Sequence, residues 1–88
     1  MKTYSVGYDL RKPGRDYTAL FNAIKSYPNW AHVLKSQWLI RSDKTAVAIR
    51  DHLARYMDEN DGLLINEFGA AAWQGLTGEL SEWIRKAA

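Results

Sequence analysis

The spacing of apolar residues switches repeatedly between two periods along this chain, and the switching limits the folds open to it. In a half-buried strand every second residue is apolar, whereas in an amphipathic helix every third or fourth residue is apolar. Residues 4–10, YSVGYDL, follow the first period. Their bulky side chains share one face. The small or polar side chains on the other face are Ser5, Gly7 and Asp9.

Two later segments follow the helical period. Residues 16–27 predict a helix that Asp16 caps, after a turn at Pro13-Gly14. Its apolar stripe consists of Tyr17, Leu20, Phe21 and Ile24. Residues 43–58 predict a second helix, capped by Ser42 or Asp43. Its stripe consists of Ala46, Ile49, Leu53, Tyr56 and Met57.

The remaining segments are extended, apart from the last. Residues 30–42, WAHVLKSQWLIRS, predict two short strands or one strand with a bulge, because Lys35-Ser36 interrupts the pattern. Residues 63–68, LLINEF, are apolar enough to predict a strand that is central or covered on both faces. Thr77 can cap a last helix, whose apolar residues are Leu80, Trp83 and Ile84.

This order predicts one α+β domain over residues 1–88. We expect a ferredoxin-like βαββαβ sandwich with a C-terminal helix, in which a four-stranded antiparallel sheet carries the first two helices on one face. Cysteine is absent, which excludes disulfides and thiolate metal sites. No apolar run is long enough to span a membrane, and no secretory signal is visible. The expected location is the cytoplasm, with no membrane partner.

Charge is distributed unevenly along the chain. Residues 1–50 hold nine Lys or Arg and three Asp or Glu, whereas residues 51–88 hold three and seven, so that balances of +6 and −4 make the net charge of +2. The basic first half is compatible with a phosphate-bearing partner such as nucleic acid or a nucleotide. An ordinary solvated surface explains it equally well.

Four stretches of the chain carry a resemblance to a known family. They are YSVGYDL, YTALFNAIKSY, SQWLIRSD and LLINEFGAAAWQGL, and with their connections they span about residues 3–76. Together they resemble the CRISPR-associated protein 2 family and its stand-alone "SinR-like" relatives. The resemblance implies a ferredoxin-like homodimer. Some members of that family are metal-dependent nucleases, and others act as structural bridges between integrase subunits.

The resemblance assigns one residue a chemical role. Asp9 matches the family's strand-end aspartate, so that two copies, one from each subunit, would share a Mg²⁺ ion. Residues 77–88, TGELSEWIRKAA, depart from the family because they predict a helix, where CRISPR members tend to end in a strand that joins the partner's sheet. The bridging role is therefore not carried over.

The candidate site residues also have simpler interpretations. Asp9, the candidate catalytic residue and metal ligand, would otherwise be a turn aspartate that accepts backbone N–H bonds. Arg11, Lys12 and Arg15 are candidate phosphate-binding residues, because they precede a helix N-terminus, or else they form a solvated turn.

The other chemistry-bearing residues give weaker signals. His32 and His52 have no acid–base or metal spacing, and Ser5 and Ser36 lack a nucleophile motif. The tryptophans suit a small core or an interface better than base stacking; they are Trp30, Trp38, Trp73 and Trp83. The acidic turn is interpreted as a solvated face; it holds Asp58, Glu59 and Asp61.

Two functions of different class follow. In the first, a homodimer binds nucleic acid or nucleotide and acts as a Mg²⁺-dependent endonuclease through Asp9. In the second, the same fold is a non-catalytic module that binds nucleic acid, a nucleotide or a protein, or that regulates a partner. The single candidate carboxylate favours the second.

Overall fold

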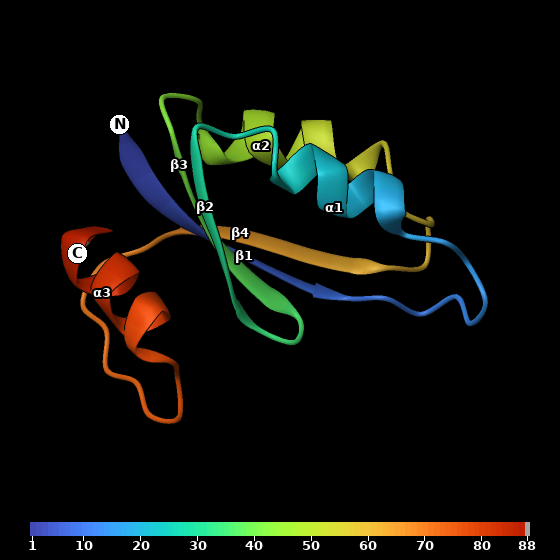
Figure 1. Ribbon diagram of the computed structural model, residues 1–88. Helices are drawn as coiled ribbons and strands as arrows, with labels where there is room; N and C mark the ends of the chain where they lie inside the picture. The colour runs from blue at the N-terminus through green and yellow to red at the C-terminus, as the bar shows by residue number, and fades with distance from the viewer. Residues whose placement is uncertain (88) are drawn as a thin grey trace.

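The computed structural model describes residues 1–87 and contains one sheet and three helices (Figure 1). In chain order the elements are β1 (Lys2–Asp9), α1 (Thr18–Ile24), β2 (Asn29–Leu34), β3 (Gln37–Ser42), α2 (Ala46–Ala54), β4 (Gly62–Glu67) and α3 (Gly78–Ala87). The strands form an antiparallel sheet in the order β2-β3-β1-β4. The predicted βαββαβ order with a C-terminal helix is confirmed.

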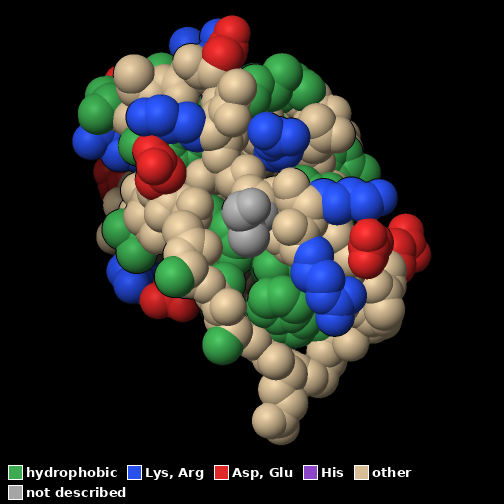
Figure 2. Space-filling view, turned by 90° about the vertical axis from the view of Figure 1, so that its left-hand side faces the viewer, with side chains coloured by type: hydrophobic (Ala, Val, Ile, Leu, Met, Phe, Trp, Pro, Cys, Tyr) green, Lys and Arg blue, Asp and Glu red, His purple; other side chains and the backbone are tan. Residues whose placement is uncertain are grey.

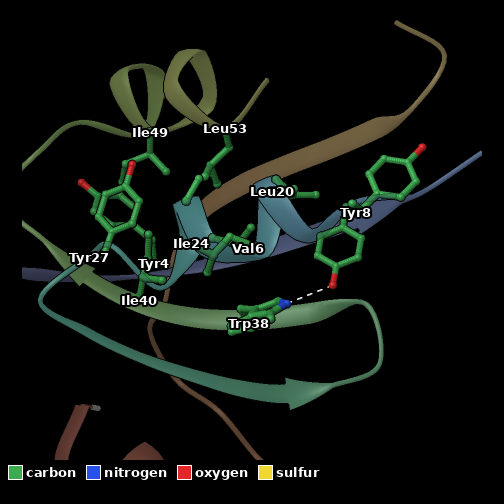
Figure 3. Packing of buried hydrophobic residues seen from close by; sticks show 12 residues of the cluster. Tyr4, Val6, Tyr8, Leu20, Ile24, Tyr27, Trp38, Ile40, Ile49 and Leu53 are labelled. Atoms are coloured by element: carbon green, nitrogen blue, oxygen red, sulfur yellow. Dashed lines mark hydrogen bonds between the residues drawn. The ribbon is translucent and has the colours of Figure 1, made fainter. Parts of the chain in front are cut away.

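Strand β1 lies inside the sheet, between β3 and β4. Its alternating pattern is confirmed, because the side chains of Tyr4, Val6 and Tyr8 are buried on one face. Trp38 and Ile40 of β3 lie opposite Val6 and Tyr4 and extend the same buried face. Figure 3 shows these residues packed beneath the helices, with the Trp38 indole N–H donating to the Tyr8 hydroxyl at 2.9 Å.

Helices α1 and α2 both cover this face, as predicted (Figure 1). Their apolar stripes point toward the sheet because residues three and four apart share one side of a helix. The fully buried members are Leu20, Ile24, Ile49 and Leu53. They form one cluster with the bulky side chains of β1 and β3.

The helix caps match the predictions in part. The prediction of Asp16 for α1 is wrong, since Tyr17 is the N-cap residue and makes no side-chain cap bond. The Asp16 carboxylate instead accepts the Thr18 N–H at 2.9 Å and turns the chain before the helix begins. The prediction of Ser42 or Asp43 for α2 is wrong, since the Thr45 hydroxyl accepts the Ala48 N–H at 3.1 Å. Ser42 instead accepts the Lys44 N–H at 3.0 Å and turns the chain before the helix begins. Thr77 caps α3 as predicted.

Helix α3 lies on the opposite face of the sheet (Figure 1). Its buried residue Ile84 packs against Ala31, Val33 and Leu39 of β2 and β3. Helix α3 thus packs mainly over β2 and β3 rather than over the small face of β1. It leaves Gly7, Asp9 and Leu64 uncovered, and a Cβ added to Gly7 would meet nothing within 4 Å. Half of this face is therefore open.

Strand β4 is an edge strand, so the prediction of a central or doubly covered strand is wrong. Leu63 and Ile65 face the helices and pack against the core, whereas Leu64 points to the open face and is 67% exposed. The apolar run hid this alternation because both faces of the strand carry leucine or isoleucine. Among the described helices, none is long and apolar enough to cross a membrane.

The buried hydrogen bond between Trp38 and Tyr8 generates a prediction about stability. Tyr8→Phe leaves the indole N–H without its partner inside the core, so the free energy of unfolding should fall by about 1–3 kcal/mol. Tyr4→Phe is the matched control on the same face of β1. Its hydroxyl donates to the Lys44 carbonyl, at an exposed residue that water can reach, so the loss should be about 0.5–1.5 kcal/mol. Urea unfolding followed by circular dichroism measures both, and equal losses would contradict the assignment.

Candidate functional site at the end of β1

Asp9 is the last residue of β1, and its side chain is 74% exposed. It lies opposite Gly62, the first residue of β4, at the end of the sheet that α3 does not cover. The Arg11 guanidinium approaches its carboxylate at 3.4 Å. Asp9 is therefore an accessible acceptor beside one cation of its own chain.

The three predicted phosphate-binding residues all contact carboxylates. Arg11 pairs with Asp9, while Lys12 and Arg15 lie 3.5 and 3.7 Å from one oxygen of Asp58. Such partly exposed pairs contribute little to stability, because water screens them. A phosphate at this loop would have to compete with these carboxylates for the same cations.

Asp61 ties the basic loop to the turn before β4. Its carboxylate accepts the Arg11 N–H at 2.7 Å, the Asp58 N–H at 2.8 Å and the Tyr17 hydroxyl at 3.0 Å. Burial raises the pKa of Asp61, but these three hydrogen bonds and the charge of Arg15 outweigh it, and the pKa lies below its ordinary value of 3.8. The carboxylate therefore fixes both ends of the loop that follows Asp9.

The acidic turn thus differs from its interpretation as a solvated face. The Asp58 side chain is only 13% exposed, and Asp61 is half-buried. The strand order explains the difference: β1 and β4 are antiparallel neighbours, so the loop after β1 adjoins the turn before β4. The opposite charges of the basic loop and the acidic turn were the signal in the sequence that these segments contact each other. That signal could be used only once the pairing of β1 with β4 was known.

A hollow of about 510 Å³ opens beside Asp9. Three elements form it: the end of β1, helix α1 and the turn between β2 and β3. Its lining residues are Tyr8, Asp9, Leu10, Arg11, Phe21, Lys35 and Ser36. Asp9 and Arg11 meet here as the sequence suggested, whereas Lys12 and Arg15 lie outside it. Sequence reasoning missed Lys35, because its position depends on the β2–β3 turn reaching the end of β1, where the Tyr8 N–H donates to the Ser36 carbonyl at 3.1 Å.

Lys35 has no ion-pair partner in the described structure. Among residues 1–87, no carboxylate oxygen lies within 4.0 Å of its ammonium group. The hollow therefore combines an available cation and a second, weakly paired cation with the rings of Tyr8 and Phe21. These groups suit a ligand that carries both negative charge and a flat apolar part.

A single chain offers a Mg²⁺ ion one carboxylate at this site, that of Asp9. The described residues contain no group of three His, Cys, Asp or Glu side chains that would suit a metal. Asp9 offers a single carboxylate, and Arg11 already contacts it. A magnesium site normally takes one or two carboxylates together with phosphate oxygens and water. A second carboxylate would have to come from another copy of the chain.

The histidines have structural partners. The Tyr27 hydroxyl lies 2.8 Å from Nδ1 of His52, and burial, together with the charges of Arg55 and Lys44, lowers the pKa of His52 below its ordinary value of 6.5. His52, on α2, thus packs against Tyr27, which follows the end of α1. The exposed His32 stacks on Trp38, with ring centres 4.0 Å apart and planes 7° apart.

The tryptophans divide into two groups. Trp38 belongs to the main core, and Trp83 packs with Ile84 against the other face of the sheet. Trp30 and Trp73 are 41% and 37% exposed. The prediction of core or interface positions therefore describes the first pair and leaves the second pair on the surface.

The pKa of Asp61 predicts how stability depends on pH. Because its folded pKa is depressed, the carboxylate stabilises the fold above its ordinary pKa, and this contribution is lost as pH falls through the folded value. Between about pH 5 and pH 3 the wild type should therefore lose more stability than Asp61→Asn. Tyr17→Phe removes one of the three donors and should give an intermediate slope. Thermal unfolding at a series of pH values measures this, and a wild-type acid profile in Asp61→Asn would refute it.

Comparisons of the chain with protein-family models, with curated proteins and with solved structures found no match. The resemblance to the CRISPR-associated protein 2 family therefore stays a prediction from the sequence motifs.

Proposed function

We propose that the protein is a homodimer that binds nucleic acid or a nucleotide, with a phosphate held in the hollow at the end of β1. The observation that carries this proposal is the position of Lys35, an unpaired cation that lines the hollow together with Arg11 and the half-buried Phe21. A phosphate oxygen could accept from both cations while a flat ring contacts the aromatic wall.

The opposite end of the molecule is less suited to a phosphate backbone. Figure 2 shows the end that carries both chain termini, where Lys and Arg side chains alternate with Asp and Glu side chains. One of these contacts is the pair between Lys2 and Glu67, at 3.2 Å. Mixed charges of this kind give no continuous basic surface, which favours the hollow beside Asp9 as the phosphate site.

The open half of the sheet face supports the homodimer. Gly7 leaves a shallow trough over β1 and β4, which Gly62 also lines, and Leu64, which lies opposite Gly7, borders it with a side chain that is 67% exposed. A second copy seated in this trough would bury both Leu64 side chains. It would also bring the two Asp9 residues toward one another, since Asp9 lines the same trough.

A metal-dependent phosphodiesterase is the second candidate function. The position of Asp9 at the border of the trough favours it, because the dimer would supply the second carboxylate that one chain lacks. Two such carboxylates are the kind of ligand that Mg²⁺ takes in phosphoryl-transfer sites. Binding of nucleic acid requires no such site, so binding and cleavage can be tested separately.

The dimer predicts opposite effects of one substitution at two glycines. Gly7→Arg places a long side chain in the trough, where the chain itself leaves room, so the protein should fold but the dimer should dissociate. Gly69→Arg is the matched control: it also has room, but lies beyond β4 and away from the trough. Light scattering should give twice the chain mass of 10.1 kDa for the wild type and for Gly69→Arg, and the chain mass for Gly7→Arg. A wild type that is monomeric at high micromolar concentration would refute the dimer.

Phosphate binding in the hollow predicts a change in salt dependence. Each lost phosphate contact lowers the slope of log K against log salt by about 0.7 for a single-stranded oligonucleotide. Lys35→Ala should weaken binding and lower the slope by about this amount. Lys44→Ala should leave both unchanged, because this exposed lysine follows β3 at the other end of the sheet.

Asp9→Asn in the same titration separates the two candidate functions. The exchange removes a negative charge beside the phosphate, so binding should hold or tighten. Mg²⁺-dependent cleavage that stops in Asp9→Asn while binding persists would support the phosphodiesterase. Equal salt slopes for the wild type and Lys35→Ala would refute the binding of phosphate in the hollow.

A further inference from the structure

We infer that Trp30 and His32, on the outer edge of the helix-covered sheet face, stack on the bases of single-stranded nucleic acid. The inference rests on the proposed function and extends it, because it names the form of nucleic acid and the surface that reads it. The hollow beside Asp9 would take the phosphate, and this edge would take the bases.

The sheet register places both rings on one face. Trp30 lies opposite Ile40 and His32 lies opposite Trp38, so both side chains point to the side that α1 and α2 cover. Strand β2 is an edge strand, however, so α1 covers it only at its margin: Phe21 stacks on Trp38 at 6.1 Å, and Lys25, the C-cap residue of α1, lies over the Trp30 ring. Trp30 and His32 both remain exposed.

The rings are held in place before any ligand arrives. His32 lies parallel to Trp38, and its Nε2 is 3.2 Å from the Lys35 carbonyl. Trp38 is fixed by its bond to Tyr8, and Trp30 packs against it with ring centres 5.6 Å apart. Bases that stack here meet a surface that needs little further ordering, which favours binding.

Positive charge accompanies the rings. The Lys25 ammonium lies 5.4 Å from the centre of the Trp30 ring, and Lys35 follows His32 in the β2–β3 turn. Among residues 1–87, neither lysine has a carboxylate oxygen within 4.0 Å. Exposed aromatic rings beside unpaired cations are the chemistry that binds single strands, since bases stack on the rings and phosphates meet the cations.

This surface is continuous with the phosphate hollow. Phe21 lines the hollow and stacks on Trp38. Lys35 also lines the hollow, and its backbone carbonyl oxygen lies within hydrogen-bond distance of His32 Nε2. A strand whose phosphate sits between Arg11 and Lys35 would therefore have neighbouring bases within reach of His32 and then Trp30.

The spacing of the rings favours a single strand over a duplex. Trp30 and His32 are two residues apart on a strand, a separation of roughly 7 Å. Stacked bases in a duplex are about 3.4 Å apart along each strand, and their flat faces are covered by their neighbours. Only unstacked bases can meet both rings, so the partner is single-stranded.

Trp73 provides a matched control. It is 37% exposed and Arg85 lies 5.8 Å from its ring centre, so it resembles Trp30 in exposure and charge. Its indole N–H donates to Ser81 at 3.0 Å, which fixes the loop before α3 on the other side of the sheet. We expect this residue to take no part in base stacking.

The test measures binding of single-stranded oligothymidylate to the full chain. Trp30→Ala should weaken binding by about 5-fold to 150-fold, the range that loss of one stacked base gives. The salt slope should not change, because stacking releases no counterions. Trp30→Phe keeps a flat ring and should recover most of the affinity, whereas Trp73→Ala should bind as the wild type does. His32→Ala should also weaken binding, and thermal unfolding of each variant shows that it is folded.

The outcomes separate this inference from the proposed function. If the wild type binds and Lys35→Ala lowers the salt slope, but Trp30→Ala and His32→Ala bind normally, the stacking surface is refuted and the phosphate site stands. Tighter binding of the duplex of the same sequence would also refute the inference. A wild type that binds no oligonucleotide in any form would refute the proposed function itself.

Discussion

Strand β1 is the constraint on which the rest of the structure depends. It pairs with β3 on one side and β4 on the other, and its alternation gives the sheet one bulky face and one small face. The bulky face requires cover, which α1 and α2 provide around the fully buried Val6. On the side of the small face, α3 packs over β2 and β3 and leaves the surface beside Gly7 open. The end of the same strand carries Asp9, so core, trough and candidate site are all set by one segment.

The cations near Asp9 illustrate how a small fold uses charge for two purposes. Lys12 and Arg15 contact Asp58, and Asp61 binds the backbone of the basic loop, so these groups position the loop. Lys25 and Lys35 are free of such contacts in the described structure and lie beside aromatic rings instead. The first group is thus compensated by carboxylates, whereas Lys25, which follows α1, and Lys35, in the β2–β3 turn, are not.

Much of the fold could be predicted from the sequence, since periodicity reports directly which faces of a helix or strand are buried. The stripes through Leu20 and Leu53 and the cap at Thr77 follow from local pattern alone. The edge position of β4 could not be predicted, because Leu64 is as apolar as its buried neighbours. The site was only partly predictable: Asp9 is recognisable at a strand end, whereas Lys35 and His32 acquire their neighbours through the register of β2 and β3.

The two layers of the molecule rest on clusters of very different size. The main cluster joins β1, β3 and two helices, whereas α3 contributes one buried side chain, Ile84, after a long connection from β4. Such an element can open locally without unfolding the sheet, because few buried contacts hold it. The backbone amides of α3 should thus exchange with solvent at a lower free energy than those of β1. We therefore expect the sheet to stay folded while its cover on this side opens.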